Sequence, residues 1–243
     1  MIEISGLSKT YGGKQALDDV SFRAEQGKVT ALIGPNGAGK STTILMMLGL
    51  TEPTSGIVEI CGINSTTHPI EVKRKIGYLP EDVGFYDDMT GPENLMYTAR
   101  LNGIPDKEAK VKALELMKRV GLEDQLKKKA GKYSRGMRQR LGLADVLIKN
   151  PEIIILDEPT VGLDPKQINE IRDLIKGLKQ KHTVILSSHI LSEVSAVCDY
   201  VLIISHGKLV ASDTPENLGK LAAGSNNLNP VSYTHLTLPT NSR

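Results

Sequence analysis

Residues 34–41 read GPNGAGKS, and this short stretch decides the fold. It follows the apolar run 29–33, and a helix-type pattern begins at Lys40. The spacing matches GxxxxGK followed by Ser or Thr, a loop whose backbone N–H groups surround phosphate oxygens. The N-terminus of the following helix adds a partial positive charge. The stretch predicts a nucleotide-binding α/β core in which Lys40 reaches the β- and γ-phosphates and Ser41 ligates Mg²⁺.

A second signal lies at the end of another apolar run. Residues 153–156 are Ile-Ile-Ile-Leu, and Asp157 and Glu158 follow directly. A buried strand ending here would place Asp157 beside the phosphate loop, where it can hold Mg²⁺ through water. Glu158 would then be able to accept a proton from an attacking water. Because many apolar strands end in acidic residues, it is the combination with the glycine-rich loop that indicates a nucleoside triphosphatase.

Strand-type and helix-type patterns alternate along the chain, which favours an α/β fold. The patterns predict strands over 2–5, 17–24, 29–33, 57–63, 76–79, 153–156, 184–187 and 200–204. They predict helices over 40–49, from about 90, from a cap at Asp106 to Gly121, from a cap at Ser134 to 148, and over 167–180. In the helix after Asp106, we expect one shared face of Val111, Leu114, Met117 and Val120. Residues 1–229 are predicted to form a single domain, with a helical subdomain of about 90–148 inserted between strands.

Composition is that of an ordinary globular protein. The 243 residues carry a net charge of +2, with 24% charged and 40% hydrophobic residues. Without a basic excess or aromatic platforms, nucleic-acid binding is not expected. Cys61 and Cys198 stand far apart in sequence, which favours reduced thiols in a cytosolic protein. We find neither a signal-peptide pattern nor an apolar run of membrane-spanning length, so any membrane role is expected to run through a partner.

The last residues differ in character from the rest. Residues 231–243, VSYTHLTLPTNSR, resemble a translated sequencing adapter and follow a polar stretch that looks like a linker. We therefore expect native sequence to stop near Asn229 and residues 230–243 to be a non-native tail. The alternative is a natural terminal strand, because Val, Tyr, Thr and Leu favour strands.

From Met1 to about Leu221, the set of motifs resembles the ATPase subunit of an ATP-binding cassette (ABC) transporter. Tyr11, in KTYGG, matches the aromatic residue that stacks on adenine in that family. Residues 133–141, YSRGMRQRL, stand where the family has its signature, usually LSGGQ. The resemblance implies that this segment touches ATP held by the opposite subunit of a dimer.

Two further segments follow the family pattern, and one departs from it. Asp164 lies in a loop that resembles the one coupling the two facing sites, and His189 matches the switch histidine that contacts the γ-phosphate. After strand 76–79 the family usually places Gln, where this chain has Glu81. Glu is also an oxygen ligand, so ATP chemistry need not fail, although its charge could alter metal affinity or rate. Glu81, the YSRGM signature and FYDDMTGPENL (85–95) together resemble a branch of drug-resistance and other exporters with a separate permease.

The resemblance implies a P-loop NTPase core with an N-terminal antiparallel β-subdomain and an inserted α-helical subdomain. The implied cofactors are ATP and Mg²⁺. The implied catalytic residues are Lys40, Glu158 and His189, and the implied metal ligands are Ser41, Glu81 and Asp157. The implied nucleotide contacts are Tyr11, Gly34, Pro35, Asn36, Gly37, Ala38, Gly39, Lys40, Ser41, Thr42, Ser134, Gly136 and Asp164.

The implied function is ATP hydrolysis that drives transport. The expected partners are a second ATPase subunit, identical or related, and a separate transmembrane permease that holds the protein on the cytoplasmic face of the membrane. Two alternatives remain: a soluble single-cassette ATPase, such as one for cluster assembly, and a non-hydrolysing nucleotide sensor. The substrate, the choice between homodimer and heterodimer and the direction of transport are left open by the sequence.

Overall fold

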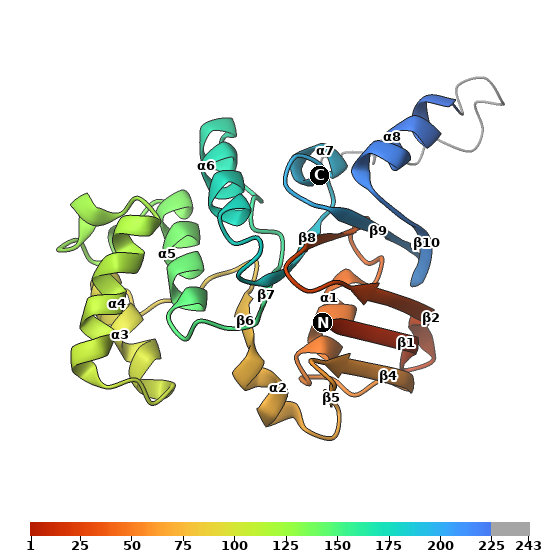
Figure 1. Cartoon of the computed structure of the whole chain (residues 1–243), viewed down its shortest axis with the longest axis horizontal. Coiled ribbons are helices and arrows are strands. Elements are labelled where there is room, and N and C mark those ends of the chain that lie inside the picture. Colours follow the sequence, from red (N-terminus) through yellow and green to blue (C-terminus); the bar gives the residue numbers. More distant parts are fainter. Residues whose placement is uncertain (225–243) are drawn as a thin grey trace.

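The computed structural model describes residues 1–224 and arranges them as two β-sheets with helices around them (Figure 1). The first sheet is antiparallel and has the strand order β2-β1-β4-β5. Its strands are β1 (Ile2–Tyr11), β2 (Lys14–Ala24), β4 (Ser55–Ile60) and β5 (Ile63–Asn64). Hydrophobic residues on its inner face, Ile2, Ile4 and Leu7 among them, are buried against the rest of the molecule.

The second sheet has the order β10-β9-β3-β8-β7-β6 and is parallel except for the edge pair β9 and β10. Its strands are β3 (Val29–Ile33), β6 (Ile76–Leu79), β7 (Ile153–Leu156), β8 (Thr183–Ser188), β9 (Tyr200–Ser205) and β10 (Lys208–Asp213). Parallel strands need crossover connections, which here are helical. The carboxyl ends of β3, β7 and β8 therefore meet at one edge of the sheet.

Eight α-helices lie in the described part of the chain, residues 1–224. They are α1 (Lys40–Met47), α2 (Pro69–Lys75), α3 (Gly91–Leu101), α4 (Asp106–Arg119), α5 (Arg135–Leu147), α6 (Pro165–Lys176), α7 (Leu191–Val194) and α8 (Pro215–Gly224). Helices α3, α4 and α5 lie side by side on the opposite side of the central sheet from the antiparallel sheet (Figure 1). None of the helices in residues 1–224 is long and apolar enough to cross a bilayer.

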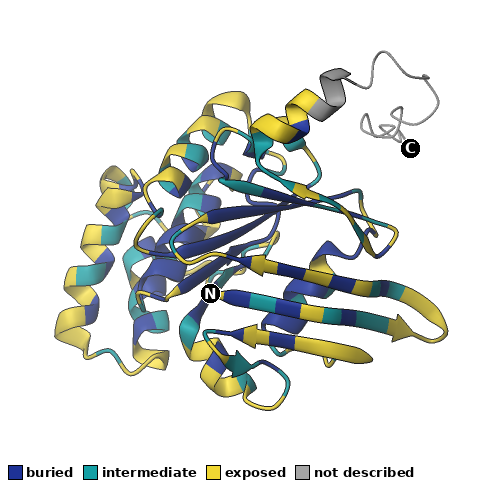
Figure 2. Ribbon diagram, turned by 45° about the vertical axis from the view of Figure 1, so that its right-hand side comes forward, coloured by how far each residue is buried: buried dark blue, intermediate teal, exposed yellow. Residues whose placement is uncertain are grey.

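Both faces of the central sheet are covered. Along β7, Ile153 and Ile155 pack into one hydrophobic cluster with α1 and the antiparallel sheet. Ile154 and Leu156 pack into a second cluster with α3, α4, α5 and α6. Figure 2 shows these central strands buried and the outer faces of the helices exposed. Burial on both faces explains why the strand reads as an unbroken apolar run rather than an alternating one.

This architecture confirms the predicted P-loop core with an N-terminal antiparallel sheet. Helices α3 to α5 fall between β6 and β7 in the chain. The division into one domain of 1–229 with a subdomain of 90–148 stays a prediction. The predicted non-native tail, 230–243, lies outside the described residues.

Several predicted elements have different boundaries in the structure, and two of them show a clear local cause. The strand expected over 57–63 is broken at Cys61 and Gly62, whose positive φ angles of 53° and 76° turn the chain between β4 and β5. The helix expected over 167–180 starts earlier and stops earlier. Asp164 caps it by accepting a hydrogen bond from the Gln167 N–H at 2.9 Å, and it ends before Gly177.

The prediction for α4 was wrong in two respects. Pro105, not Asp106, occupies the cap position, and Asp106 instead pairs with Arg100 at 2.7 Å. The expected apolar face is also displaced, because Val111 and Leu114 are 54% and 41% exposed. The buried face of α4 carries Ala109, Ala113 and Met117. Alanine side chains take little room, so α4 packs closely on this face, and Met117 and Val120 of the predicted set are buried as expected.

Candidate active site

The loop after β3 needs glycine at two enclosed positions. A Cβ atom on Gly34 would lie 2.3 Å from the carbonyl oxygen of Ile204. Gly39 has a φ of 113°, and a Cβ atom there would lie 2.5 Å from Leu17 Cδ2. Within residues 1–224, no side chain caps the N-terminus of α1, which starts at Lys40. The backbone N–H groups of this turn therefore remain available to an anion.

A cavity of about 200 Å³ opens beside this loop. Its walls combine the glycine-rich loop, the first residues of α1, one residue of β2 and two carboxylates. They are Ala16, Pro35, Asn36, Gly37, Gly39, Lys40, Ser41, Thr42, Glu81 and Glu158. Ala16 was not predicted. A larger cavity, of about 460 Å³, lies among β2, β3, β9 and β10 and contains none of the predicted site residues.

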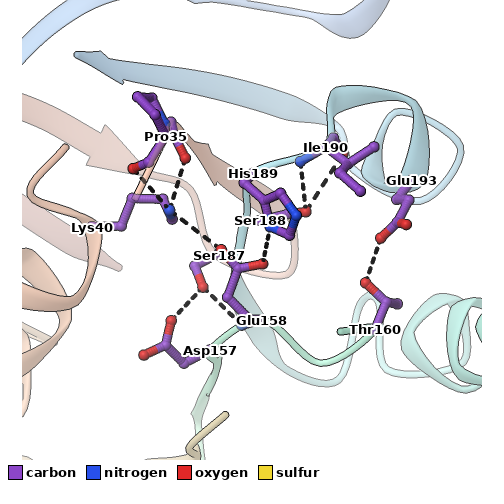
Figure 3. A network of polar contacts seen from close by, with 11 residues as sticks. Pro35, Lys40, Asp157, Glu158, Thr160, Ser187, Ser188, His189, Ile190 and Glu193 are labelled. Atoms are coloured by element: carbon purple, nitrogen blue, oxygen red, sulfur yellow. Dashed lines mark hydrogen bonds and ion pairs between the residues drawn. The ribbon is translucent and has the colours of Figure 1, made fainter. Parts of the chain in front are cut away.

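Lys40 is buried, and its ammonium group is held on three sides. It donates hydrogen bonds to the carbonyl oxygens of Gly34 at 2.7 Å and Pro35 at 3.3 Å (Figure 3). It also lies 3.3 Å from Glu158 Oε1. The side chain thus folds back over the loop, with its charge at the cavity wall.

Glu158 connects two of the predicted residues. One carboxylate oxygen faces Lys40, and the other lies 2.9 Å from His189 Nδ1. The residue has a φ of 47°, in the left-handed region that non-glycine residues seldom adopt. Such backbone conformations persist where surrounding contacts hold them, often at functional sites. Figure 3 shows Lys40, Glu158 and His189 converging from α1, the end of β7 and the end of β8.

Asp157 is held by a residue that sequence reasoning missed. Its Oδ1 accepts a hydrogen bond from Ser187 Oγ at 2.5 Å, and the same Ser187 oxygen accepts the Glu158 N–H at 2.9 Å. On the other side of β7, burial raises the pKa of Tyr78 to about 12, and the nearby Asp157 carboxylate adds to the effect. Tyr78 therefore stays protonated at neutral pH.

The segment after Glu158 is tied to the helix after His189. Thr160 Oγ1 donates to Glu193 Oε2 at 2.6 Å. Arg172, on α6, donates to the backbone carbonyl of Glu193 at 2.6 Å. This network joins the ends of β7 and β8 through α6 and α7. The sequence does not predict this network, because its residues are far apart in the chain and form no motif.

Six predicted nucleotide contacts do not line the cavity: Gly34 and Ala38, which belong to the loop itself, and four residues that lie elsewhere. Tyr11 is exposed at the end of β1, with the Lys9 ammonium 4.8 Å from its ring centre. Ser134 caps α5 by accepting the Met137 N–H at 3.3 Å. Gly136 lies against the Gln167 side chain, and Asp164 caps α6. Their assigned roles stay predictions.

The donors around the cavity fit Mg²⁺. Ser41 and Glu81 line it, and Asp157 directly precedes the lining residue Glu158. One hydroxyl and two carboxylates supply the oxygen atoms that Mg²⁺ prefers as ligands. Among residues 1–224, no three His, Cys, Asp or Glu side chains converge closely enough to hold a metal by themselves. Mg²⁺ commonly binds through one or two carboxylates together with water and substrate phosphates, so such a sparse set suits an ion that arrives with a nucleotide.

This chain is similar in sequence and in structure to ATP-binding proteins of ABC transporters. The family model described as ABC transporter matches residues 17–161. The bacitracin transport ATP-binding protein BcrA of Bacillus licheniformis is 45% identical, over 90% of this chain and 72% of its own length. The daunorubicin/doxorubicin resistance ATP-binding protein DrrA of Streptomyces peucetius is 38% identical, over 93% of this chain and 68% of its own. A dimeric ATP-binding cassette in a post-hydrolysis state with ADP and Pi superposes with a TM-score of 0.80 at 26% identity, over 88% of this chain and 99% of that one.

Proposed function

This chain belongs to the ABC transporter family as an ATP-binding subunit with ATPase activity, and from that premise we propose that it powers export of an antibiotic-like compound through a separate permease. The observation that carries the proposal is the contact of the buried Lys40 and Glu158 with each other and with His189 beside the glycine-rich loop. The relatives named for bacitracin transport and for daunorubicin and doxorubicin resistance support the direction and the class of cargo.

In the proposed reaction, the glycine-rich loop binds the phosphates of ATP through backbone N–H groups, and Lys40 turns from Glu158 toward the β- and γ-phosphates. Glu158, released from Lys40, accepts a proton from the attacking water. His189 orients the Glu158 carboxylate through its 2.9 Å contact and reaches the γ-phosphate. Lys40 thus exchanges a protein contact for a substrate contact when ATP binds, whereas His189 keeps its contact with Glu158 and adds one to the substrate.

Mg²⁺ bound with ATP would neutralise charge on the phosphate oxygens. Ser41 and Asp157 are the residues proposed to hold it, and Glu81 stands on the cavity wall where it can contribute a further oxygen. The extra negative charge of Glu81, compared with the usual Gln, favours a cation at this wall.

Two copies are proposed to close face to face. Ser134, Gly136 and Asp164 do not line this chain's own cavity, which supports a role toward a second subunit. The N-terminus of α5, capped by Ser134, offers backbone N–H groups and a partial positive charge to a phosphate held by the partner. The dimeric cassette that resembles this chain supports such a pairing.

A permease on a separate chain is proposed as the membrane partner. The described helices include no membrane-spanning one, and the relatives are named as ATP-binding proteins of transporters. The proposed location is therefore the cytoplasmic face of the membrane, on that permease. The alternative of a soluble cluster-assembly ATPase is not favoured by the relatives' names.

The test is Mg²⁺-dependent ATP hydrolysis by the full chain beside E158Q and, as a matched control, E59Q, whose side chain is exposed on β4. We expect E158Q to lose at least about 100-fold in turnover, because the proton acceptor is removed. It should still bind ATP and accumulate as a dimer, whereas E59Q should behave as the wild type. Absence of ATP binding by the wild type would refute the assignment of the loop.

The cargo is tested in cells that express this chain together with the membrane protein that copurifies with it. Export predicts raised resistance to peptide antibiotics or anthracyclines, and loss of that resistance with E158Q. Unchanged resistance, with ATPase activity intact, would refute export of these compounds and leave the ATPase assignment standing.

A further inference from the structure

Ser187 lies at the carboxyl end of β8 with 0% of its surface exposed. Its hydroxyl makes two contacts with the acidic pair on the neighbouring strand. It donates its one hydrogen to Asp157 Oδ1, and its oxygen accepts the Glu158 N–H. We propose that Ser187 is a positioning residue for nucleotide hydrolysis, which fixes the Asp157 carboxylate and the Glu158 backbone relative to each other. The inference rests on the proposed function of this site.

The two contacts cannot be replaced by solvent. A serine hydroxyl carries one donor hydrogen, and here that hydrogen is committed to Asp157. Since the position is fully buried, removing the oxygen would leave the Glu158 N–H and one Asp157 oxygen without their partner. Groups left unpaired in this way either pay the desolvation penalty or rotate to find another partner. Rotation of Asp157 would change the direction in which it offers its oxygens.

The Glu158 contact has a separate consequence. Glu158 holds its φ of 47° at an energetic disadvantage, and the Ser187 oxygen is the acceptor for its N–H. This backbone conformation directs the side chain between Lys40 and His189. Loss of the Ser187 oxygen would therefore loosen Glu158, the proposed proton acceptor, as well as Asp157, the proposed metal ligand.

A purely structural hydroxyl is the alternative, and the same strand supplies a control for it. Thr183 lies four residues earlier on β8, is also buried, and accepts the Gly27 N–H at 3.1 Å. Four residues along a strand returns to the same face. T183V removes a buried hydroxyl from β8 without touching the acidic pair, so it reports the structural cost alone.

The experiment measures the affinity of the full chain for a fluorescent ATP analogue, once in EDTA and once in excess Mg²⁺. We expect the wild type to bind more tightly with Mg²⁺. S187A should keep the affinity measured in EDTA. The factor by which Mg²⁺ increases the affinity should be at least about tenfold smaller than in the wild type, as is typical when the partner of a metal ligand is removed. T183V should tighten as the wild type does. S187C, whose thiol fills the space but donates weakly, should behave as S187A and serves if S187A does not fold.

Three outcomes would overturn the proposal. These are a serine variant that tightens like the wild type, a T183V variant that loses as much as S187A, and a wild type whose affinity is the same with and without Mg²⁺. Failure of the proposed function looks different, because the wild type would then bind the analogue in neither condition.

Discussion

Gly37 and Gly39 both have positive φ angles in the phosphate loop, but only Gly39 is enclosed. Among the described residues, no atom lies within 4 Å of a Cβ placed on Gly37, whereas Leu17 Cδ2 would lie 2.5 Å from one on Gly39. We expect G37A to lower the free energy of unfolding by about 1–2 kcal/mol, from backbone strain alone. G39A should cost a further 1–3 kcal/mol or so through overpacking. Urea unfolding of the nucleotide-free protein measures both, and equal losses would contradict the steric argument.

Asp145, on α5, is a carboxyl group whose burial has a cost. Within the described chain, its Oδ1 is buried without a hydrogen-bond partner. Burial raises the pKa of Asp145 to about 6, although a hydrogen bond with Thr98 and the charge of Lys149 act in the opposite direction. The folded protein therefore binds this proton more tightly than the unfolded chain does. The contribution of this tighter proton binding to the free energy of unfolding is complete below about pH 4 and is lost as the pH rises through about 6.

Replacing Asp145 with Asn should remove this dependence on pH. Relative to the wild type, D145N is expected to gain up to about 3 kcal/mol in unfolding free energy at pH 8 and to differ little at pH 4. Denaturant titrations at the two pH values provide the measurement. D88N, at an exposed position, is the control and should shift stability equally at both. A pH-independent effect of D145N would show that ionisation of Asp145 is not what destabilises the protein.

At the scale of single residues, local motifs could predict part of the site. Lys40, Ser41, Asp157 and Glu158 belong to contiguous patterns with a chemical rationale, and the structure brings Lys40 and Glu158 into contact. Their catalytic roles stay predictions. Ser187 could not be predicted, because its importance depends on the register of β8 beside β7, which no local pattern encodes.

Among the elements, α7 depends on one side-chain contact to reach the end of β7. Glu193 accepts the hydrogen bond from Thr160, which is buried. We expect E193A to lose about 1–2 kcal/mol of unfolding free energy, because the Thr160 hydroxyl is left unpaired. E193Q keeps an acceptor oxygen and should lose less. Thermal and urea unfolding distinguish the two, and identical losses would mean that the acceptor does not matter.

The predicted boundaries were most accurate in the strands of the central sheet. Residues 29–33, 76–79 and 153–156 were predicted and observed without change, because these mostly apolar segments end at glycine, proline or charged residues, and β8 extends only one residue beyond the predicted 184–187 at each end. Elements that are partly exposed were harder to predict. Strand β1 continues to Tyr11 through polar residues, and α2, α7, α8 and β10 were not predicted at all. The side chains of α2, α7, β10 and residues 215–220 of α8 are mostly half-buried or exposed, so hydrophobic periodicity gives little signal.

For the whole molecule, nucleotide binding is expected to raise the free energy of unfolding. A nucleotide at 100 times its Kd contributes about 2.7 kcal/mol to the folded state. For a domain of this size, that raises the Tm by about 5–10 °C. We expect this shift with Mg²⁺ and ATP in E158Q, which cannot consume the ligand, and a much smaller one in E158Q combined with K40A. Differential scanning fluorimetry checks it, and equal shifts would contradict the role proposed for Lys40.

The sheet order could be predicted only in outline. Alternating patterns indicate an α/β fold, but the placement of β6 beside β7, with three long helices between them in the chain, follows from packing. Strand β7 contributes to both hydrophobic clusters, with Ile153 and Ile155 on one side and Ile154 and Leu156 on the other. The core is thus two layers divided by one sheet, and the resemblance to a known family, rather than periodicity, predicted that arrangement.

Ser134 and Gly136 stand apart from the cavity of their own chain, and this separation has a genetic consequence. In the proposed pair, each copy contributes the loop of one site and the α5 N-terminus of the other. A copy disabled at Lys40 and a copy disabled at Ser134 would together restore one complete site, although neither supports turnover alone. Two defective alleles expressed in the same cell should therefore complement each other, whereas two alleles that damage the same half should not.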